Sequence, residues 1–477
     1  MDSITMTTEQ QLPKGWKKTT LGEIATYVNG RAFKPIEWSK TGTPIVRIQN
    51  LNNPNAEYNY YDGYIEEKYH IENGDLLFAW SVSLGAYIWK GKSAFLNQHI
   101  FKVLPKENID KTFIYYLLDK VTNELYAKAH GSGMVHVTKG KFEATSVNIP
   151  PLEAQQAIVN KIESLFDEID EGIGRLKTVA QQIQQYRQSL LKNAFNGELT
   201  KEWRSKHADT LPSENELLAQ IQTTREQHHA QQLADWQTAV SQWEQNGKEG
   251  KKPSKPKAPT QAVKFEENFA DLPRGWFNFS LDMLAEISGG LTKNAKRGSF
   301  KEKVPYLRVA NVYANELKLD EIATIGIQEN EKARTLLQTN DLLIVEGNGS
   351  IEQIGRVAIW NNTINPCYHQ NHLIKARCYP FVLPKFALYF LISPMGRERI
   401  INIASSTTGL HTLSLTKVAN LIIPVCSLAE QTQIVAILES KLTACDQLAA
   451  ELAKQLKQAE LLKQAVLKAA FQGELSE

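Results

Sequence analysis

The chain repeats itself, and this repeat constrains the fold more than any other feature of its 477 residues. Residues 12–16 (LPKGW) return as residues 272–276 (LPRGW), 260 positions later. Residues 192–199 (KNAFNGEL) return as residues 468–475 (KAAFQGEL), 276 positions later. Two like units on one polypeptide form a covalent pseudo-dimer, for which a twofold is the expected closed arrangement. That shape suits a ligand with its own approximate twofold, such as duplex DNA.

The offset between the copies changes through the first part of each unit and then becomes constant. It rises from 260 at the start to 278 at Thr138 and Thr416, and it holds at 276 from Val159 and Val435 onward. Insertions collect in surface loops, and such loops carry recognition. Fixed spacing instead indicates a rigid segment at the end of each copy.

Apolar residues recur every seven positions in that rigid segment. They are Ile162, Ile169, Leu176, Ile183 and Leu190 in the first copy, and Leu438, Cys445, Leu452, Ala459 and Val466 in the second. A looser second row contains Phe166, Ile173, Val179 and Tyr186, then Leu442, Ala449, Leu456 and Leu462. This spacing is typical of coiled coils. It predicts helices over residues 154–195 and 429–471, each about 60 Å long, that end at Gly197 and Gly473. An ordinary amphipathic helix on a globular core is the alternative.

A mixed segment that contains short β-rich runs precedes each predicted helix. The predicted strands are residues 44–48, 75–81, 86–89 and 101–104, then 304–309, 341–345, 356–360 and 372–377. A shorter helix is expected near residues 111–130 and 384–404, followed by a Gly/Ser loop and a final strand that ends at Ile149 or Ile423. The pattern predicts an α+β domain in each copy.

An additional segment, residues 200–271, lies between the copies. Residues 214–245 have a helical pattern, and residues 247–264 contain six lysines, three prolines and one glutamate. The second stretch is predicted to be a flexible basic linker. A solvated tether and a basic segment that touches DNA phosphates both remain open.

Composition excludes several classes of protein. The formal charge of +2 gives no global field for nucleic acid, so any basic surface is local. The four cysteines, all in the second copy, lack the close pairs of a zinc site and are expected to be reduced thiols. Residues 1–11 lack a signal-peptide core, and no segment is long and apolar enough to span a bilayer. We therefore expect a cytoplasmic protein with no membrane contact.

The sequence lacks recognisable catalytic motifs. Residues 85–93 (GAYIWKGKS) have five residues between their glycines, where a phosphate-binding loop needs four. No Gly-x-Ser-x-Gly, His-Glu-x-x-His or Asn-Pro-Pro-aromatic motif occurs. His99 and His372 lie at matching positions without a visible nucleophile, and hydrogen bonding in a core or hairpin is the favoured interpretation. We expect no catalytic residue and no metal site, with an enzyme of unrecognised type as the alternative.

Several residue types suit the recognition of DNA, since Arg and Asn can contact guanine and adenine edges bidentately. Arg47 and Arg308 lie in apolar strands, although a structural arginine that pairs with a carboxylate is the alternative. Two polar loops, residues 131–141 and 405–417, are better candidates for reaching phosphates and base edges, with a plain β-hairpin as the alternative. The candidate DNA-binding residues are Arg47, Gln49, Asn50, Ser132, His136, Lys139, Lys141, Arg308, Asn311, Thr408, His411 and Lys417.

The order of these segments resembles a known family. Residues 149–159 (IPPLEAQQAIV) and 423–435 (IPVCSLAEQTQIV) each follow a variable domain and precede a long helix that closes with Ala-Phe-x-Gly-Glu-Leu. This resembles the DNA-specificity subunit of Type I restriction–modification systems over nearly the whole chain. The second copy departs by two extra residues before its helix, residues 425–428 (VCSL) against residues 151–152 (PL).

The resemblance implies an α+β fold with an internal pseudo-twofold repeat, in which two similar mixed α/β target-recognition domains are separated by two long helices that form an antiparallel coiled coil. The implied divisions are target-recognition domains at 1–152 and 272–427, spacer helices at 153–199 and 428–477, and a helical insertion with a basic linker at 200–271.

The resemblance also implies a non-catalytic subunit that recognises a bipartite sequence in double-stranded DNA. It would direct two adenine methyltransferase (modification) subunits, and restriction/translocase subunits in the full complex, to that sequence. S-adenosylmethionine would be bound by the methyltransferase subunits, and this chain would hold no cofactor. The alternative function is a coiled-coil scaffold that carries two protein-interaction modules without DNA contact.

Overall fold

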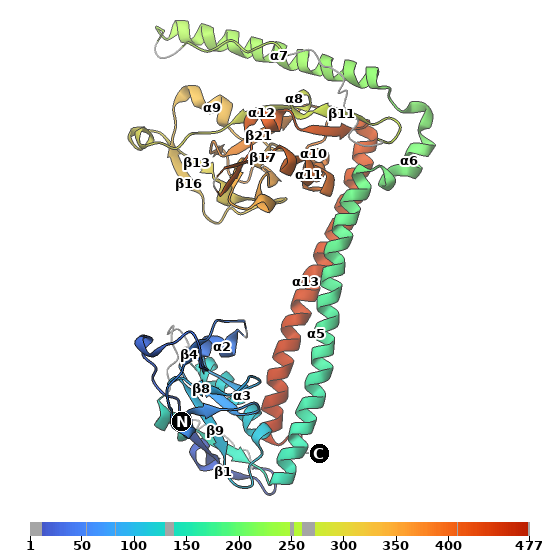
Figure 1. Ribbon diagram of the computed structural model, residues 1–477. Coiled ribbons are helices and arrows are strands. Elements are labelled where there is room, and N and C mark those ends of the chain that lie inside the picture. The colour runs from blue at the N-terminus through green and yellow to red at the C-terminus, as the bar shows by residue number, and fades with distance from the viewer. Residues whose placement is uncertain are drawn as a thin grey trace, which may run out of the picture. The chain divides into compact units, whose positions relative to one another are not determined.

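In the computed structural model, the chain divides into two compact units (Figure 1). The first contains residues 1–179 and 450–477, and the second contains residues 180–449. The structure describes residues 12–53, 55–81, 83–128, 138–248, 252–259, 272–407 and 409–475. Both long helices, α5 (Leu152–Phe195) and α13 (Leu428–Gln472), begin in one unit and end in the other. Each unit therefore contains one globular part and one end of each long helix.

The globular part of the first unit is built on two four-stranded sheets and one two-stranded sheet. The first sheet has the order β2 (Ala25–Asn29), β9 (Ile100–Pro105), β6 (Leu76–Ala79), β7 (Gly85–Ile88). The second has the order β4 (Asn59–Tyr61), β3 (Thr43–Val46), β8 (Ala94–Leu96), β5 (His70–Ile71). The two-stranded sheet pairs β1 (Lys17–Thr20) with β10 (Ser146–Ile149). The helices are α1 (Leu21–Ile24), α2 (Ile48–Asn52), α3 (Lys111–Lys128) and α4 (Lys139–Glu143).

The second unit repeats this topology. Its four-stranded sheet has the order β12 (Ala285–Gly289), β21 (Leu373–Cys378), β17 (Leu342–Val345), β19 (Val357–Ile359). Its next sheet has the order β16 (Ala323–Gly326), β13 (Lys303–Leu307), β20 (Tyr368–His369), and β11 (Phe277–Ser280) pairs with β24 (Ile422–Val425). Further strands are β14 (Val312–Tyr313), β15 (Glu316–Leu317), β18 (Gly347–Asn348), β22 (Ser405–Thr407) and β23 (Leu410–Thr412). The helices are α8 (Leu281–Leu284), α9 (Glu329–Thr335), α10 (Pro384–Ile392), α11 (Pro394–Ile403) and α12 (Leu415–Ala419).

All eight predicted strands form within a few residues of the expected positions. The helix predicted at residues 384–404 is divided into α10 and α11 at Ser393, whose side chain accepts a hydrogen bond from the Gly396 N–H at 3.1 Å. Pro394 at the first position of α11 lacks the N–H that would continue α10, which explains the break.

The register of the final strand corrects one expectation. In β1, Lys17 pairs with Ile149, and in β11, Phe277 pairs with Val425. The counterpart of Ile149 is therefore Val425 and not Ile423, so the constant offset of 276 already applies to these strands. The two extra residues expected before the second helix do not exist, because the shared Ile-Pro dipeptide had suggested a false alignment.

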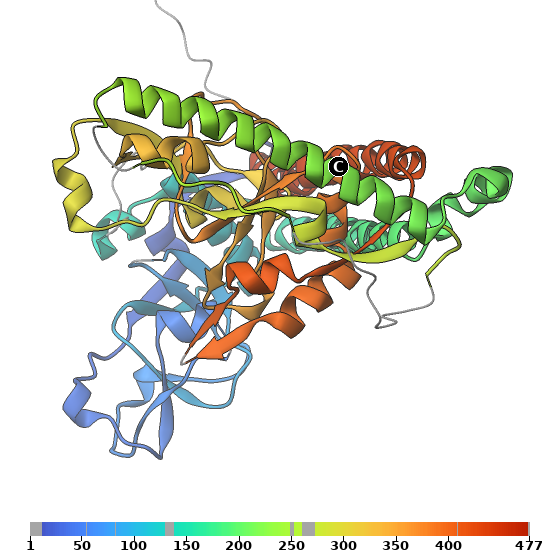
Figure 2. The same cartoon turned by 90° about the horizontal axis from the view of Figure 1, so that it is seen from above.

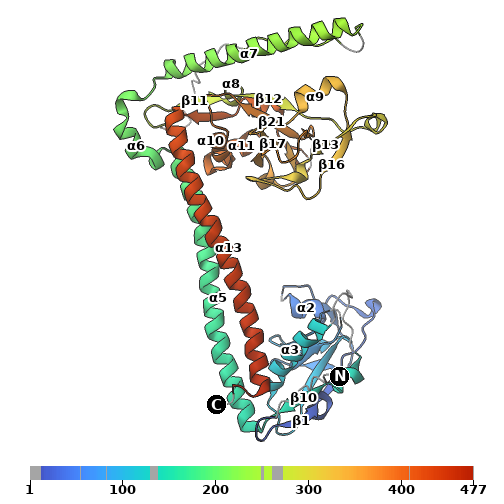
Figure 3. The same ribbon diagram turned by 180° about the vertical axis from the view of Figure 1, so that it is seen from behind.

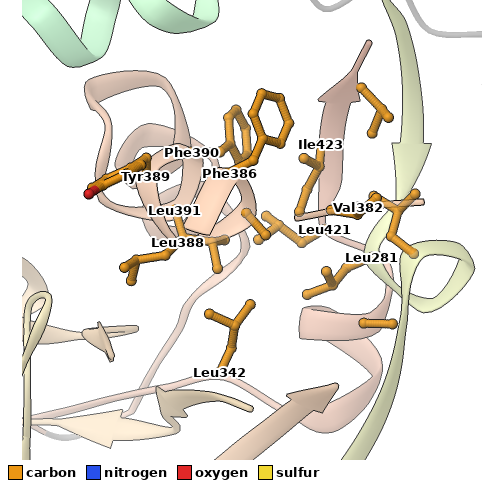
Figure 4. Close-up of a cluster of buried hydrophobic side chains, with 14 of the residues drawn as sticks. Leu281, Leu342, Val382, Phe386, Leu388, Tyr389, Phe390, Leu391, Leu421 and Ile423 are labelled. Carbon is orange, nitrogen blue, oxygen red and sulfur yellow. The ribbon is translucent and has the colours of Figure 1, made fainter. Parts of the chain in front are cut away.

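The core of the second unit joins its sheet to both long helices. Apolar residues of α10, including Phe386 and Phe390, pack with Leu281, Leu342 and Leu421 (Figure 4). The same cluster includes residues from the end of α5, residues from the start of α13, and two residues of the insertion. These apolar side chains are buried together, so the hydrophobic effect stabilises the packing of the helix ends on the globular part.

The two long helices lie side by side and antiparallel within each unit (Figures 1 and 3). In the first unit, Ile162 near the start of α5 shares a core with Val466 near the end of α13. In the second, Leu190 near the end of α5 shares a core with Leu438 near the start of α13. The predicted antiparallel pair is confirmed.

The heptad positions are turned inward as expected. None of the ten residues of the predicted seam is exposed, and the set comprises Ile162, Ile169, Leu176, Ile183, Leu190, Leu438, Cys445, Leu452, Ala459 and Val466. The looser second row is partly wrong, because Val179, Tyr186 and Leu462 are 41%, 46% and 52% exposed.

The C-terminal end of each long helix contacts the segment with which the other copy begins. Gly197 and Gly473 both have a φ of +82°, the left-handed conformation expected at a helix C-terminus. A Cβ atom on Gly197 would fall 2.1 Å from Cγ of Pro273, and one on Gly473 would fall 2.3 Å from Cγ of Pro13. The end of the first copy thus packs on the second copy, and the end of the second packs on the first.

The insertion folds onto the second unit. It contains α6 (Lys201–Lys206) and the long helix α7 (Glu214–Gln245), whose bounds agree with the predicted helix. Figures 1 and 2 show α7 running along the second unit beside α8. Among the described residues, no helix combines the length and the apolar character needed to cross a membrane.

Candidate nucleic-acid interface

The most polar repeated feature lies where two parallel strands end in each unit. In the first unit, Val46 of β3 pairs with Leu96 of β8, and the Asn97 N–H donates to the Val46 carbonyl at 3.1 Å. In the second, Leu307 of β13 pairs with His369 of β20. Arg47 and Arg308 directly follow β3 and β13, so each arginine lies beside the polar residues that follow the partner strand. Sequence reasoning had placed both arginines inside a strand.

A glycine brings a third segment to each edge. A Cβ atom on Gly30 would fall 2.1 Å from the Asn97 carbonyl oxygen, and one on Gly290 would fall 2.1 Å from the His369 carbonyl oxygen. Only glycine permits such an approach. The edge therefore has the same three-segment construction in both units.

Neither arginine side chain bonds to another residue that the structure describes. Nε of Arg47 and Nε of Arg308 are buried, and neither bonds to any residue that the structure describes. The Arg47 guanidinium also lies 5.4 Å from the centre of the Trp38 ring, which can hold it by a cation–π interaction. The carboxylate partner considered as the structural alternative is not found for either side chain within the described residues. The buried Nε atoms cannot reach DNA, so the terminal guanidinium nitrogens are the donors that suit guanine or phosphate oxygens.

The two asparagines have a different role from the expected one. Asn50 is 3% exposed, its Oδ1 accepts from the Arg47 N–H at 3.1 Å, and its Nδ2 donates to the carbonyls of Ala56 and Glu57, both at 3.2 Å. Asn311 is also 3% exposed and bonds in the same way to Arg308 and to two later carbonyls. Both amide hydrogens are used within the chain. These asparagines hold the turn below each arginine and do not offer their amides to bases.

Gln49 is exposed next to Arg47, at a position that Ala310 occupies in the second copy. Its amide nitrogen makes only a long hydrogen bond of 3.5 Å to the Glu57 carbonyl. The side chain is therefore available at the first edge and has no equivalent at the second.

The candidate residues of the polar loops divide into three groups. Ser132, His136 and Thr408 lie outside the described residues. Lys139 donates to the Tyr27 carbonyl at 2.7 Å, and Lys417 donates to the Ile403 carbonyl at 2.5 Å. The two lysines hold different positions, since Lys139 is exposed at the start of α4 whereas half-buried Lys417 is the third residue of α12.

Lys141 and His411 are the remaining loop candidates. Lys141 is exposed in α4. His411 is half-buried in β23, where it faces Ser406 of β22 and Asn348 of β18. The second loop is thus a β-hairpin added to β18, which was one of the two interpretations left open.

Two pairs of residues at the strand ends were not among the predicted DNA-binding candidates. Gln98 and His99 follow β8, and Asn371 and His372 follow β20, in the repeated order amide–imidazole. His99 packs with its ring centre 5.4 Å from that of Trp80, and His372 is exposed with its Nδ1 2.8 Å from Glu346 Oε2. Gln and Asn side chains suit adenine edges. The repeat of this dipeptide was the available signal, but its place after the parallel partner of β3 or β13 depends on a strand pairing that sequence does not show.

Buried polar groups lie below the second edge. His369 is fully buried, and burial, aided by the nearby charge of Lys375, lowers its pKa to about 3. Burial also lowers the pKa of Lys375 to about 8, although its ammonium group donates to the Arg334 carbonyl at 2.8 Å. The first unit has Leu96 where the second has His369. The residues buried beneath the two edges are therefore apolar in one unit and polar in the other.

No set of three His, Cys, Asp or Glu side chains that could hold a metal ion occurs within the described ranges. The four cysteines are all free.

Comparison with known proteins places this geometry in a family. Residues 13–178 and 273–458 both match the Type I restriction modification DNA specificity domain. The chain is 23% identical to the EcoBI specificity subunit of Escherichia coli, over 97% of this chain and 86% of that protein. It is also 23% identical to the EcoKI specificity subunit of Escherichia coli K12, over 98% of this chain and 90% of that protein. Both relatives are named as specificity subunits of Type I restriction enzymes, which supports the expectation of a non-catalytic subunit.

Solved structures share the fold. One chain, from a study of complex assembly and conformational transition of the type I R-M system, superposes with a TM-score of 0.63 at 18% identity, covering 97% of this chain and 98% of that one. The HsdS subunit of Thermoanaerobacter tengcongensis gives a TM-score of 0.51 at 18% identity, covering 98% and 99%. With matches in both copies and a shared fold over nearly its full length, the chain belongs to the Type I restriction modification DNA specificity family, as its internal repeat had indicated.

Proposed function

We propose that the chain reads a bipartite sequence in double-stranded DNA, one half with each globular part. The observation that carries this proposal is the repeated strand-end edge, in which half-buried Arg47 and Arg308 directly follow a strand whose parallel partner is also followed by polar residues. Family membership supports DNA as the ligand. An antiparallel helix pair would relate the two edges by a pseudo-twofold, so that each meets the major groove of duplex DNA with the same geometry.

The two half-sites need not match, because the edges differ in detail. Gln49 has no counterpart, and Leu96 stands where the second copy has His369. A true homodimer would require a palindrome, and fusion of two unlike copies removes that requirement.

In this proposal the chain supplies specificity, and its partners supply chemistry in the cytoplasm. Two modification subunits would bind S-adenosylmethionine and methylate adenine, and restriction/translocase subunits would complete the assembly. The names of the curated relatives support this division.

The test replaces one arginine at a time in the complex with its modification subunits. Arg47→Ala should relax the sequence at one half-site, and Arg308→Ala should relax it at the other. Loss of one bidentate contact costs about 1–3 kcal/mol of discrimination. Sequencing of methylated adenines in host DNA reports both half-sites in one measurement.

Arg175→Ala is the matched control, since Arg175 is exposed on α5 and its removal changes the net charge equally. The control should leave the methylated sequence unchanged. The proposal is wrong if both arginine variants leave it unchanged, or if either one relaxes both halves. A gel-shift with the complex at several salt concentrations addresses the scaffold alternative. Phosphate contacts make DNA binding fall steeply with salt, so the absence of salt-dependent DNA binding would favour a scaffold.

A further inference from the structure

The described end of α7 and the basic segment after it form one ordered surface. We call residues 229–248 and 252–259 the α7 finger. Before it, Leu217 and Ile221 are buried in the core of the second unit, and Nε2 of His228 lies 3.3 Å from Oε2 of Glu286. Beyond His228, α7 continues for about 25 Å at the usual rise per residue.

The basic segment packs on the helix and is not a free tether. Nε1 of Trp236 donates to the Pro253 carbonyl at 3.0 Å. The Lys255 ammonium lies 5.8 Å from the centre of the Trp236 ring, and the Lys252 ammonium lies 5.9 Å from that of Trp243. Lysine stems can cover apolar surface while their charges stay in water. The described part of the predicted flexible linker is therefore docked on α7.

This packing gathers positive charge on one surface. Lys248, Lys252, Lys255 and Lys257 are all exposed, and the described finger contains only Asp235 and Glu244 as acidic residues. Aromatic rings under the lysines already restrict these side chains before binding. Less side-chain freedom is therefore lost on binding, which lowers the cost of each contact. The surface complements a ligand that carries a regular array of negative charges.

We propose that the α7 finger binds the phosphate backbone of duplex DNA that flanks the half-site read by the second unit. This inference rests on the proposed function, which brings a duplex to the second unit. Because the insertion packs on the second copy, the contact would add affinity on one flank of the target without adding sequence information.

The experiment uses the full chain in its complex with modification subunits. The fourfold variant Lys248→Gln, Lys252→Gln, Lys255→Gln, Lys257→Gln is compared with wild type on two duplexes, one with long and one with minimal DNA beyond the second half-site. Wild type should bind the long duplex at least tenfold more tightly. The variant should lose this advantage, and its salt slope should fall by about 1 for each lysine that contacts a phosphate.

Two further variants sharpen the result. A control that changes Lys14, Lys17, Lys18 and Lys40 to Gln removes the same charge from exposed positions of the first unit, and it should keep the advantage of the long duplex. The pair Trp236→Ala and Trp243→Ala keeps all four lysines but removes the rings that Lys248, Lys252 and Lys255 lie over. It should lower the advantage too, whereas full retention would refute an ordered surface.

Failure of this inference is distinct from failure of the proposed function. If wild type binds its target with no preference for the long duplex, the finger does not contact DNA, although the function stands. If the fourfold variant binds DNA normally but loses a protein subunit, the finger serves an acidic protein partner and the inference is overturned. If the wild-type complex binds neither duplex, the proposed function itself fails.

Discussion

Asp170 and Asp446 are equivalent residues of the repeat, and each pairs with a cation of the opposite long helix. In the first unit, Asp170 Oδ1 lies 2.5 Å from Nζ of Lys463 on α13. In the second, Asp446 on α13 pairs with Arg187 on α5. Arg187 lies 17 residues after Asp170 on α5, and Asp446 lies 17 residues before Lys463 on α13. Both pairs thus obey one antiparallel register.

This register predicts how the spacing between half-sites can be changed. Paired insertions after Thr178 on α5 and after Lys454 on α13 keep the register. Three heptads in each helix add about 32 Å, which is close to one turn of DNA at 34–36 Å. The methylated target should then gain about 9–10 base pairs between its halves. Scrambled insertions of equal length in the same places should abolish methylation, and an unchanged spacer in the heptad variant would refute the spacer role.

Gln155 and its counterpart Gln431 predict a stability effect. Gln155 is 1% exposed, its Oε1 accepts from the Asp110 N–H at 2.9 Å, and its Nε2 donates to the carbonyls of Asn108 and Pro150. Gln431 makes the same set of bonds. Gln155→Leu should lower the free energy of unfolding by about 2–4 kcal/mol, because buried backbone groups lose their partners. Urea denaturation measures the change, and Gln156→Leu, at an exposed neighbour, should stay within about 0.5 kcal/mol of wild type. Equal effects would contradict the anchoring role.

Two glycines of the first unit predict opposite effects of the same substitution. Gly473→Ala should destabilise by about 1–3 kcal/mol, because φ is +82° and the new Cβ would meet Pro13. Gly174→Ala, in the interior of α5 with no atom within 4 Å of the new Cβ, should stabilise by about 0.5–1 kcal/mol. Thermal unfolding distinguishes them, and a shift of both in one direction would be inconsistent with these helix-end contacts.

His369 predicts an acid sensitivity of the second unit. Its pKa falls from 6.5 in the unfolded chain to about 3 in the folded one, so the unfolded state binds the extra proton first. Stability from this group is complete above about pH 6.5 and declines as the pH falls toward 3. At pH 5 the loss is about 2 kcal/mol.

His369→Leu copies the residue of the first unit, Leu96, and should remove that loss. The measurement is the difference in unfolding free energy between pH 7.5 and pH 5, which cancels any effect of the substitution that does not depend on pH. A variant that loses as much as wild type would show that the imidazole is not the source.

The long-range pattern of the fold was predictable because it is repeated and periodic. Heptads in the regions of Ile162 and Leu438 placed α5 and α13 to within a few residues, and Gly197 and Gly473 marked their ends. These signals are local, so no knowledge of tertiary structure was needed.

The candidate site was less predictable because it depends on pairing between distant strands. Nothing local shows that Val46 lies beside Leu96, and so the place of Arg47 next to the polar residues after β8 was not seen. Asn50 looked like a base reader because sequence reports its chemistry but not its burial or its bonds to Ala56 and Glu57.

The most direct test exchanges one globular part of the chain and leaves the other unchanged. Residues 272–425 are replaced by the equivalent segment of another family member, and methylated adenines are mapped across the host genome. The account predicts that one half of the bipartite target changes while the other half and the spacer length stay as in wild type. A target in which both halves change, or neither does, would contradict it.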